Sequence, residues 1–373
     1  MSKYETLGII LSNFHDETLK ELTEYRTTAS VPFGGRYRFI DFALSNMVNT
    51  GIRDVGIVTK NNYRSLMDHI GSGREWDLSR KRGGLVVLPP FSNNFFGIYR
   101  GRIEALACAL TYIKASKAKY VLVTDSDVIA NINYEKAIDD HISKNADITV
   151  MYKPGMFEYE NMRDVDTICF DGKKRLTDIM INPLVSGEQN IYLDMFIINR
   201  ELCEKIITDS ISHNKYSFSR DILQAKNDAL YINCFEIEGY AKKISSLKTY
   251  FEASMELLDK SVRDELFPRS SPIYTKVRDE VPVRYGLNSI VSNSLIADGC
   301  KIDGEVINSI IFRGVKISRG ARVKNSIVMQ GATIGENASL DYVITDKDVL
   351  IKDSRTLTGY KTYPMFIAKA KIV

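Results

Sequence analysis

The C-terminal part of the chain repeats a short unit, and this repeat limits its fold more than any other feature. The units recur at intervals of 15, 17 and 16 residues and are Asn293–Ile296, Asn308–Ile311, Asn325–Val328 and Asp341–Ile344. Between them an aliphatic residue recurs every six positions, as from Ile311 to Ile317, and we expect the last such step from Ile344 to Leu350. Hexapeptide spacing predicts three short strands per coil around a triangular core, which is a parallel β-helix over residues 287–373.

The preceding part of the chain alternates β-branched runs with helical patterns, which is typical of a mostly parallel sheet flanked by helices. We expect strands at 6–11, 55–59, 85–88, 120–124, 148–152, 191–198 and 230–237, and helices at 101–117, 134–143 and 249–263. This predicts an α/β domain over residues 1–265. Pro268, Pro272 and Pro282 give residues 266–286 the composition of a linker.

Composition excludes several classes of function. Lys and Arg minus Asp and Glu is 50 − 47 = +3, too near balance to indicate a nucleic acid or an acidic membrane as partner. The five cysteines are scattered without a CxxC pair, and we expect buried thiols in a reducing compartment. No secretory leader and no apolar run of about 18 residues is present, so we expect a cytoplasmic protein.

The histidines do not indicate a metal or a catalytic base. They are His15, His69, His141 and His213, which are far apart and contain no i, i+4 pair. No GxSxG motif supports a serine nucleophile. A β-helix acyltransferase would need a histidine in its coils, and no histidine follows His213. An interaction role for the β-helix is therefore the better interpretation.

The stretch Val31–Asn46 combines a glycine turn with cations. Gly34 and Gly35 predict a tight turn, a helix with one buried face follows, and Arg36 and Arg38 lie at the turn. Basic residues beside such a turn suit a phosphate-bearing ligand. The alternative is an ordinary strand–turn–helix connection with two solvated arginines.

Three short motifs lie between the glycine turn and the hexapeptide repeat. Trp76–Leu78 reads WDL, Leu88–Pro90 reads LPP and Tyr99–Gly101 reads YRG, and the hexapeptide repeat follows. Together they resemble the ADP-glucose pyrophosphorylase (glucose-1-phosphate adenylyltransferase) family over nearly the whole chain. The resemblance implies a Rossmann-like, GT-A-like nucleotidyltransferase domain, a left-handed β-helix and tetramers. It also implies the reaction of ATP with glucose 1-phosphate to give ADP-glucose and pyrophosphate.

The first loop departs from the family pattern. Where the family has AGGxGTRL and, farther on, Lys-Pro, this chain has SNFHDETL and Thr28-Ala29. The glycines that let a phosphate approach are gone, and Thr18 replaces an arginine. Phe14 adds bulk, and Asp16 adds negative charge. The changed positions in this region are Asn13, Phe14, Asp16, Thr18 and Thr28.

The other positions expected to carry the chemistry are also changed. By resemblance, Asp127 survives from the pair of aspartates that hold Mg²⁺, but Lys243 stands where the second is expected, and an ammonium cannot ligate a metal. Asn182 replaces the lysine that grips the sugar phosphate. Phosphates that repel each other need cations and metal ligands, so efficient transfer is physically implausible.

Selective loss of this kind resembles the non-catalytic GlgD-type subunits of the family, which act beside a catalytic GlgC-type subunit. We therefore expect a hetero-oligomer, with Mg²⁺ and the intact site in the catalytic partner and no cofactor in this chain. Arg26 and Arg38 match residues that bind sugar-phosphate effectors in the family, although a structural hydrogen bond explains each equally well. The alternative is an active sugar-phosphate nucleotidyltransferase with a rebuilt site, in which Asp125, Asp127 and Asp166 would hold a metal.

Overall fold

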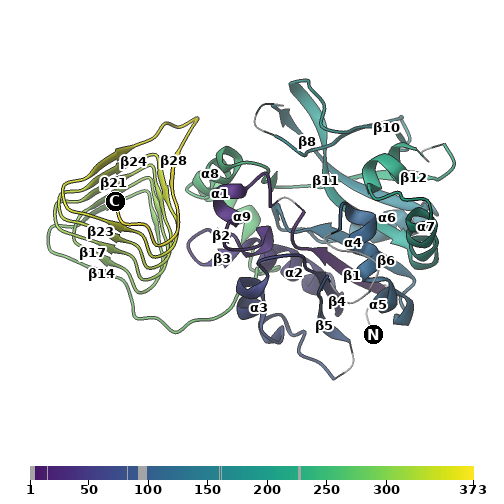
Figure 1. Cartoon of the computed structure of the whole chain (residues 1–373), viewed down its shortest axis with the longest axis horizontal. Coiled ribbons are helices and arrows are strands. Elements are labelled where there is room, and N and C mark those ends of the chain that lie inside the picture. Colours follow the sequence, from purple (N-terminus) through teal and green to yellow (C-terminus); the bar gives the residue numbers. More distant parts are fainter. Residues whose placement is uncertain are drawn as a thin grey trace.

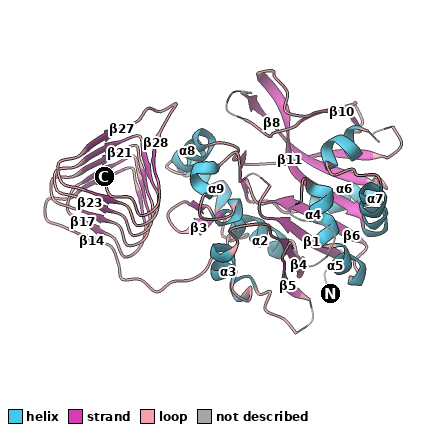
Figure 2. Cartoon of the chain, viewed as in Figure 1, coloured by secondary structure: helices cyan, strands magenta, loops and turns pink. Residues whose placement is uncertain are grey.

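The computed structural model describes residues 5–14, 16–81, 83–90, 99–158, 160, 162–225 and 228–373. A sheet domain and a coiled stack of short strands lie side by side (Figure 1). Helices α8 and α9 lie on the side of the sheet domain that faces the stack (Figure 2). Within the described residues, no helix is both long and apolar enough to cross a membrane.

The main sheet is built around strand β1 (Thr6–Leu11), which pairs in parallel with β4 (Asp54–Val58) and β6 (Tyr120–Asp125). Strand β5 (Gly84–Leu88) extends the parallel part beyond β4. Beyond β6, strand β11 (Gly187–Asn199) pairs antiparallel with β6, β8 (Ile148–Phe157) and β9 (Thr167–Phe170), and β10 (Leu176–Met180) pairs antiparallel with β9. Strand β12 (Ile232–Glu236) pairs in parallel with β8. The expected strands are confirmed, and β8 and β11 are longer than the sequence predicted.

Helices with buried apolar residues complete the sheet domain. They are α1 (Lys20–Thr23), α2 (Phe39–Asn49), α3 (Arg64–Ile70), α4 (Arg102–Cys108), α5 (Leu110–Ala115), α6 (Glu135–Ser143), α7 (Arg200–Ser212), α8 (Leu247–Glu256) and α9 (Lys260–Leu266). Short helices of other types span Thr28–Ser30, Arg74–Trp76 and Ser219–Gln224.

Two of the predicted helices are each divided. The stretch 101–117 forms α4 and α5, which meet where the Ala109 N–H donates to the Leu106 carbonyl in a tight turn. The stretch 249–263 forms α8 and α9, because Asp259 accepts a hydrogen bond from the Ser261 N–H and starts a new helix. Apolar periodicity continues through such breaks, so the sequence pattern did not reveal them.

The glycine turn lies in a hairpin of β2 (Pro32–Phe33) and β3 (Tyr37–Arg38). Gly34 and Gly35 have φ of 57° and 84°, a region that disfavours a Cβ. Helix α2 then starts, with the Asp41 carboxylate accepting from the Arg38 N–H at 2.9 Å. The predicted strand, turn and helix are confirmed.

Residues 284–367 form three parallel sheets of a left-handed β-helix, the predicted hexapeptide fold. The first sheet contains β14 (Arg284–Tyr285), β17 (Lys301–Ile302), β20 (Lys316–Ile317), β23 (Thr333–Ile334) and β26 (Leu350–Ile351). The second contains β15 (Ile290–Ser292), β18 (Glu305–Ile307), β21 (Arg322–Lys324), β24 (Ser339–Asp341) and β27 (Thr356–Thr358). The third contains β16 (Leu295–Ile296), β19 (Ile310–Ile311), β22 (Ile327–Val328), β25 (Val343–Thr345) and β28 (Met365–Ile367). Strand β14 lies inside the predicted linker.

The fourth repeat unit starts one residue later than predicted. Asn293, Asn308 and Asn325 have positive φ, and Tyr342 takes this position in the next coil with φ of 54°. The next inward-facing aliphatic residue of the six-residue spacing is therefore Ile351, which is fully buried. The predicted residue, Leu350, is 39% exposed. The prediction was wrong because Asp341 resembles asparagine, while backbone register places Asp341 opposite Lys324.

The two domains share one apolar cluster. Leu22, Phe33 and Phe251 of the sheet domain belong to the same cluster as Ile327 and Ile344 of the β-helix. Its continuity across the junction indicates that the domains are packed together rather than merely tethered. The five cysteines form no disulfide, and four are buried as expected, but Cys169 is exposed on strand β9, contrary to the prediction.

Candidate functional site

The loop after β1 is held closed by its own side chains. Asp16 accepts hydrogen bonds from the Thr28 N–H at 2.8 Å and the Thr28 hydroxyl at 2.7 Å. Its second oxygen accepts from the Asn13 amide at 2.7 Å. Burial raises the pKa of Asp16. The changed positions Asn13, Asp16 and Thr28 thus bind one another, and His15 lies outside the described residues.

Phe14 fills the space beside this loop. Its ring stacks on Tyr99 with centroids 5.7 Å apart and an interplanar angle of 22°. The Arg102 guanidinium lies over the Phe14 ring, 5.3 Å from its centroid. The predicted bulk is therefore packed against neighbours. Thr18 lies farther along, where it lines a separate groove with residues of the β-helix such as Phe366.

Buried carboxylates meet buried cations at the carboxyl end of the sheet. The Lys243 ammonium lies 2.8 Å from Asp127 Oδ2 and 2.6 Å from Asp194 Oδ2. The Arg102 guanidinium lies 2.6 Å from Asp125 Oδ2 and 2.7 Å from the same Asp194 oxygen. We call these five residues the paired cluster. The side chains of its four members other than Arg102 are at most 3% exposed.

Backbone geometry fixes the paired cluster. Strand β13 (Ala241–Lys243) pairs antiparallel with β7 (Val128–Ala130), which sets Lys243 opposite Val128. The Ile244 N–H donates to the Asp127 carbonyl at 2.8 Å. Asp194 lies where the β11 register shifts and has φ of 56°, so its carboxylate is turned out of the regular strand pattern.

A divalent cation does not fit this arrangement. The ammonium of Lys243 already contacts Asp127 and Asp194 at the distances of close ion pairs. Burial alone would lower the pKa of Lys243, but Asp127 and Asp194 raise it above its ordinary value, so the lysine remains charged. Within the described residues, no group of three or more acidic, histidine or cysteine side chains is arranged to hold a metal.

Asp125, Asp127 and Asp166 are the aspartates that would hold a metal in the rebuilt-site alternative. All three are buried, and Asp166 has a raised pKa because of burial and the nearby Asp194 charge. Asn182, which replaces the expected lysine, is exposed, and its N–H lies 3.4 Å from Asp166 Oδ1. Carboxylates at this edge therefore take part in internal contacts.

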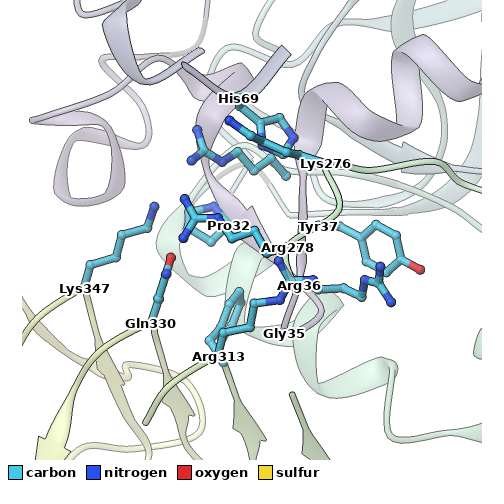
Figure 3. Close-up of a pocket in the computed structure, with 12 residues that line it drawn as sticks. Pro32, Gly35, Arg36, Tyr37, His69, Lys276, Arg278, Arg313, Gln330 and Lys347 are labelled. Atoms are coloured by element: carbon cyan, nitrogen blue, oxygen red, sulfur yellow. The ribbon is translucent and has the colours of Figure 1, made fainter. Parts of the chain in front are cut away.

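A second site lies between the domains, and we call it the basic cavity. It is partly open, and its empty space, the adjoining solvent included, is about 440 Å³. Figure 3 shows that Arg36 and Tyr37 come from the hairpin turn, Lys276 and Arg278 from the linker, and Arg313, Gln330 and Lys347 from the β-helix. The remaining lining residues are Pro32, Gly35, Arg38, His69 and Phe312. None of these described lining residues is acidic.

Burial and mutual repulsion act on the cations of the basic cavity. Burial, with the charges of Arg38 and Arg26, lowers the pKa of Lys347 to about 7. Burial also lowers the pKa of Arg38 to about 10, and its guanidinium donates to the Ser65 carbonyl at 2.7 Å. An anion in the cavity would relieve this repulsion.

The two arginines expected to bind an effector lie in different surroundings. Arg38 lines the basic cavity. Arg26 is buried and donates to both oxygens of Asp346, each at 2.8 Å, across the domain junction. Arg26 therefore has the structural hydrogen bonds that were the alternative to effector binding.

Sequence reasoning missed several of these residues. Arg102 and Asp194 belong to the paired cluster, but the sequence pattern predicted only a helix around Arg102 and a strand around Asp194. The linker residues Lys276 and Arg278 and the β-helix residue Lys347 meet only in three dimensions. The lone charge inside the apolar run 191–198 could have indicated Asp194, since an aspartate is disfavoured within a buried strand.

Comparisons with known proteins match both domains. Residues 7–260 match the nucleotidyl transferase family model, and residues 281–361 match the GlmU-like C-terminal hexapeptide model. The glycogen biosynthesis protein GlgD of Bacillus subtilis is 34% identical over 373 residues, covering 100% of this chain and 98% of that protein. GlgD of Geobacillus stearothermophilus is 38% identical over 318 residues, covering 85% and 82%.

The relatives also include proteins with an enzyme name. A glucose-1-phosphate adenylyltransferase of Bacillus mycoides is 32% identical over 369 residues, covering 96% of each chain. The similarity thus extends over both domains in GlgD proteins and in the named transferases alike. The chain belongs to the nucleotidyl transferase family, within the group formed by the GlgD proteins and the glucose-1-phosphate adenylyltransferases.

Proposed function

We propose that this chain is a catalytically silent, regulatory subunit of glucose-1-phosphate adenylyltransferase in glycogen biosynthesis. It would assemble with a catalytic subunit of the same fold, in a hetero-oligomer that we expect to be a tetramer. The observation that carries the proposal is the position of Lys243, whose ammonium contacts Asp194 and also Asp127, the aspartate that by resemblance would hold Mg²⁺. With a lysine there, neither Asp127 nor Asp194 is available to a Mg²⁺–nucleotide complex.

The first loop supports the same conclusion. Phosphate transfer needs backbone amides and cations that face the phosphates. Here Asp16 accepts the hydrogen bond of the Thr28 N–H, and the Phe14 ring contacts both Tyr99 and Arg102. The Arg102 guanidinium in turn contacts Asp125 and Asp194. The groups that could attract a phosphate are therefore bound internally.

The basic cavity suits a regulatory ligand. Its cations converge from the hairpin, the linker and the β-helix, so a bound anion would contact three parts of the chain. We propose that it takes a phosphorylated sugar, with Arg38 and Lys347 among its contacts. Such a ligand would bind better to one arrangement of the two domains than to another, which is what a ligand needs to change the conformation.

The test is an assay of the purified chain with ATP, Mg²⁺ and glucose 1-phosphate, alone and mixed with a catalytic subunit. We expect no turnover above background from the chain alone and an increased rate or effector response in the mixture. Co-elution of the two chains on size exclusion should accompany the increase. Robust turnover by the chain alone would favour the rebuilt-site enzyme and reject the silent subunit.

A further inference from the structure

The paired cluster contains more negative charge than an apolar sheet end can hold without cations. Three carboxylates, Asp125, Asp127 and Asp194, lie within contact distance of Lys243 and Arg102. Their side chains are 0% to 3% exposed. Buried carboxylates without a counter-charge are strongly destabilising, so the cations are required by the carboxylates.

Lys243 and Arg102 do not serve the same carboxylates. Arg102 bridges Asp125 and Asp194, while Lys243 bridges Asp194 and Asp127. Lys243 contacts Asp127 at 2.8 Å, so loss of the lysine removes a buried counter-charge from this carboxylate. The ammonium is a compact point charge with two carboxylate oxygens at 2.6 and 2.8 Å, which is an arrangement that a small cation shares.

The strands hold the two carboxylates in place independently of the lysine side chain. Asp127 is positioned by the hydrogen bond from the Ile244 N–H to its carbonyl, and Asp194 by the register shift in β11. Truncating Lys243 would therefore leave both oxygens facing the space that the ammonium had filled. Oxygen ligands at a buried, preformed position favour Mg²⁺ or Mn²⁺.

We infer that Lys243 is a built-in cation that substitutes for a divalent metal at this edge of the sheet, and that its removal converts Asp127 and Asp194 into a divalent-cation site. The substitution makes the fold of the sheet domain independent of metal. It goes beyond the proposed regulatory function, because it concerns cation binding and stability and not turnover. An experiment can therefore reject the inference about Lys243 without rejecting the proposed regulatory function, and the reverse.

The experiment compares the full chain with its Lys243→Ala variant in EDTA, in Mg²⁺ and in Mn²⁺, by thermal unfolding and by Mn²⁺ titration in a calorimeter. We expect the unfolding temperature of the unchanged protein to be the same in all three conditions. The variant should unfold several degrees lower in EDTA and recover in Mn²⁺, because a ligand that binds only the folded state stabilises it. Its Mn²⁺ affinity should be about tenfold or more above that of the unchanged protein.

Two further variants make the result specific. Lys242→Ala removes a neighbouring lysine that pairs with Glu256 at the surface, and it should behave like the unchanged protein toward Mn²⁺. Lys243→Ala combined with Asp194→Asn removes one proposed ligand, and it should lose the Mn²⁺ response. A folded Lys243→Ala variant that ignores Mn²⁺ would overturn the inference, as would its failure to fold with Mn²⁺ present. Mn²⁺ binding by the unchanged protein that Asp127→Asn abolishes would overturn it too.

Discussion

The paired cluster and the basic cavity both collect cations, but with opposite results. In the paired cluster Lys243 and Arg102 each contact two buried carboxylates. In the basic cavity the described lining residues include arginines and lysines and no carboxylate. Charge alone therefore does not mark a binding site: cations locked between buried carboxylates maintain the fold, whereas cations that converge on a cavity wall without carboxylates can bind an anion.

The largest expected effect separates these roles by stability. Arg102→Ala should lower the free energy of unfolding by about 3–5 kcal/mol, because it leaves Asp125 and Asp194 short of a buried counter-charge. Arg278→Ala, at an exposed position of the basic cavity, should change it by less than about 0.5 kcal/mol. Urea unfolding followed by circular dichroism measures both. Equal losses in the two variants would show that the two regions do not differ as described.

A second prediction concerns the ion pair that joins the domains. Arg26 and Asp346 are buried together, so either alanine substitution should destabilise the protein strongly. The double variant should recover about 1–3 kcal/mol relative to the sum of the single changes, since neither charge is then left unpaired. Thermal and urea unfolding of the unchanged protein, the two single variants and the double variant give this double-mutant cycle. Strictly additive losses would contradict a direct, structural pairing.

A third prediction tests the basic cavity by ligand affinity. Arg278→Ala should weaken the binding of a phosphorylated sugar about tenfold, which corresponds to about 1.4 kcal/mol. Lys316→Ala removes an exposed lysine on the β-helix that does not line the cavity, and it should leave the affinity unchanged. Calorimetric titration of both variants measures the difference. An equal loss in both would point to general attraction by positive charge.

The smallest expected effect is a pH dependence set by Lys347. The pKa of this lysine is lowered to about 7, so it loses its proton as pH rises through neutrality. Sulfate keeps a constant charge over this range, and its affinity should therefore fall a few-fold between pH 6 and pH 8. The Lys347→Met variant should bind more weakly and show a flatter profile. An affinity that rises with pH in the unchanged protein would contradict the account.

The same lysine gives the opposite sign for stability. In the unfolded chain Lys347 keeps its ordinary pKa of 10.5, above the folded value of about 7. Between these values the unfolded state binds more protons, so this residue favours folding more as pH rises. Sulfate affinity and stability should therefore change in opposite directions over the range just above neutral pH.

Much of the fold could be predicted because it depends on local periodicity. The six-residue repeat predicted the β-helix, and alternating strand and helix patterns predicted the sheet domain. The misplaced fourth unit shows the limit of this reasoning, since Tyr342 adopts the backbone conformation that asparagine has in the other coils. Register is set by pairing between coils, and a residue-by-residue pattern does not contain that information.

The candidate site could be predicted only in part. Matching positions to a known family indicated Asp127, Lys243 and the changed first loop. The pattern could not show that Lys243 meets Asp194, because strands β13 and β11 are far apart in the sequence and converge through the fold. Of the basic cavity the sequence indicated Arg36 and Arg38 at the turn, but the cations of the linker and the β-helix were missed, as the walls come from three separate segments.

Binding of Mg²⁺–ATP at the paired cluster of the isolated chain would separate an active subunit from a silent one. We predict that a calorimetric titration shows no such binding, and that any weak binding comes from the basic cavity and is weakened about tenfold in Arg278→Ala. Binding that persists in Arg278→Ala and is lost in Asp125→Asn would place the nucleotide at the paired cluster and contradict the account.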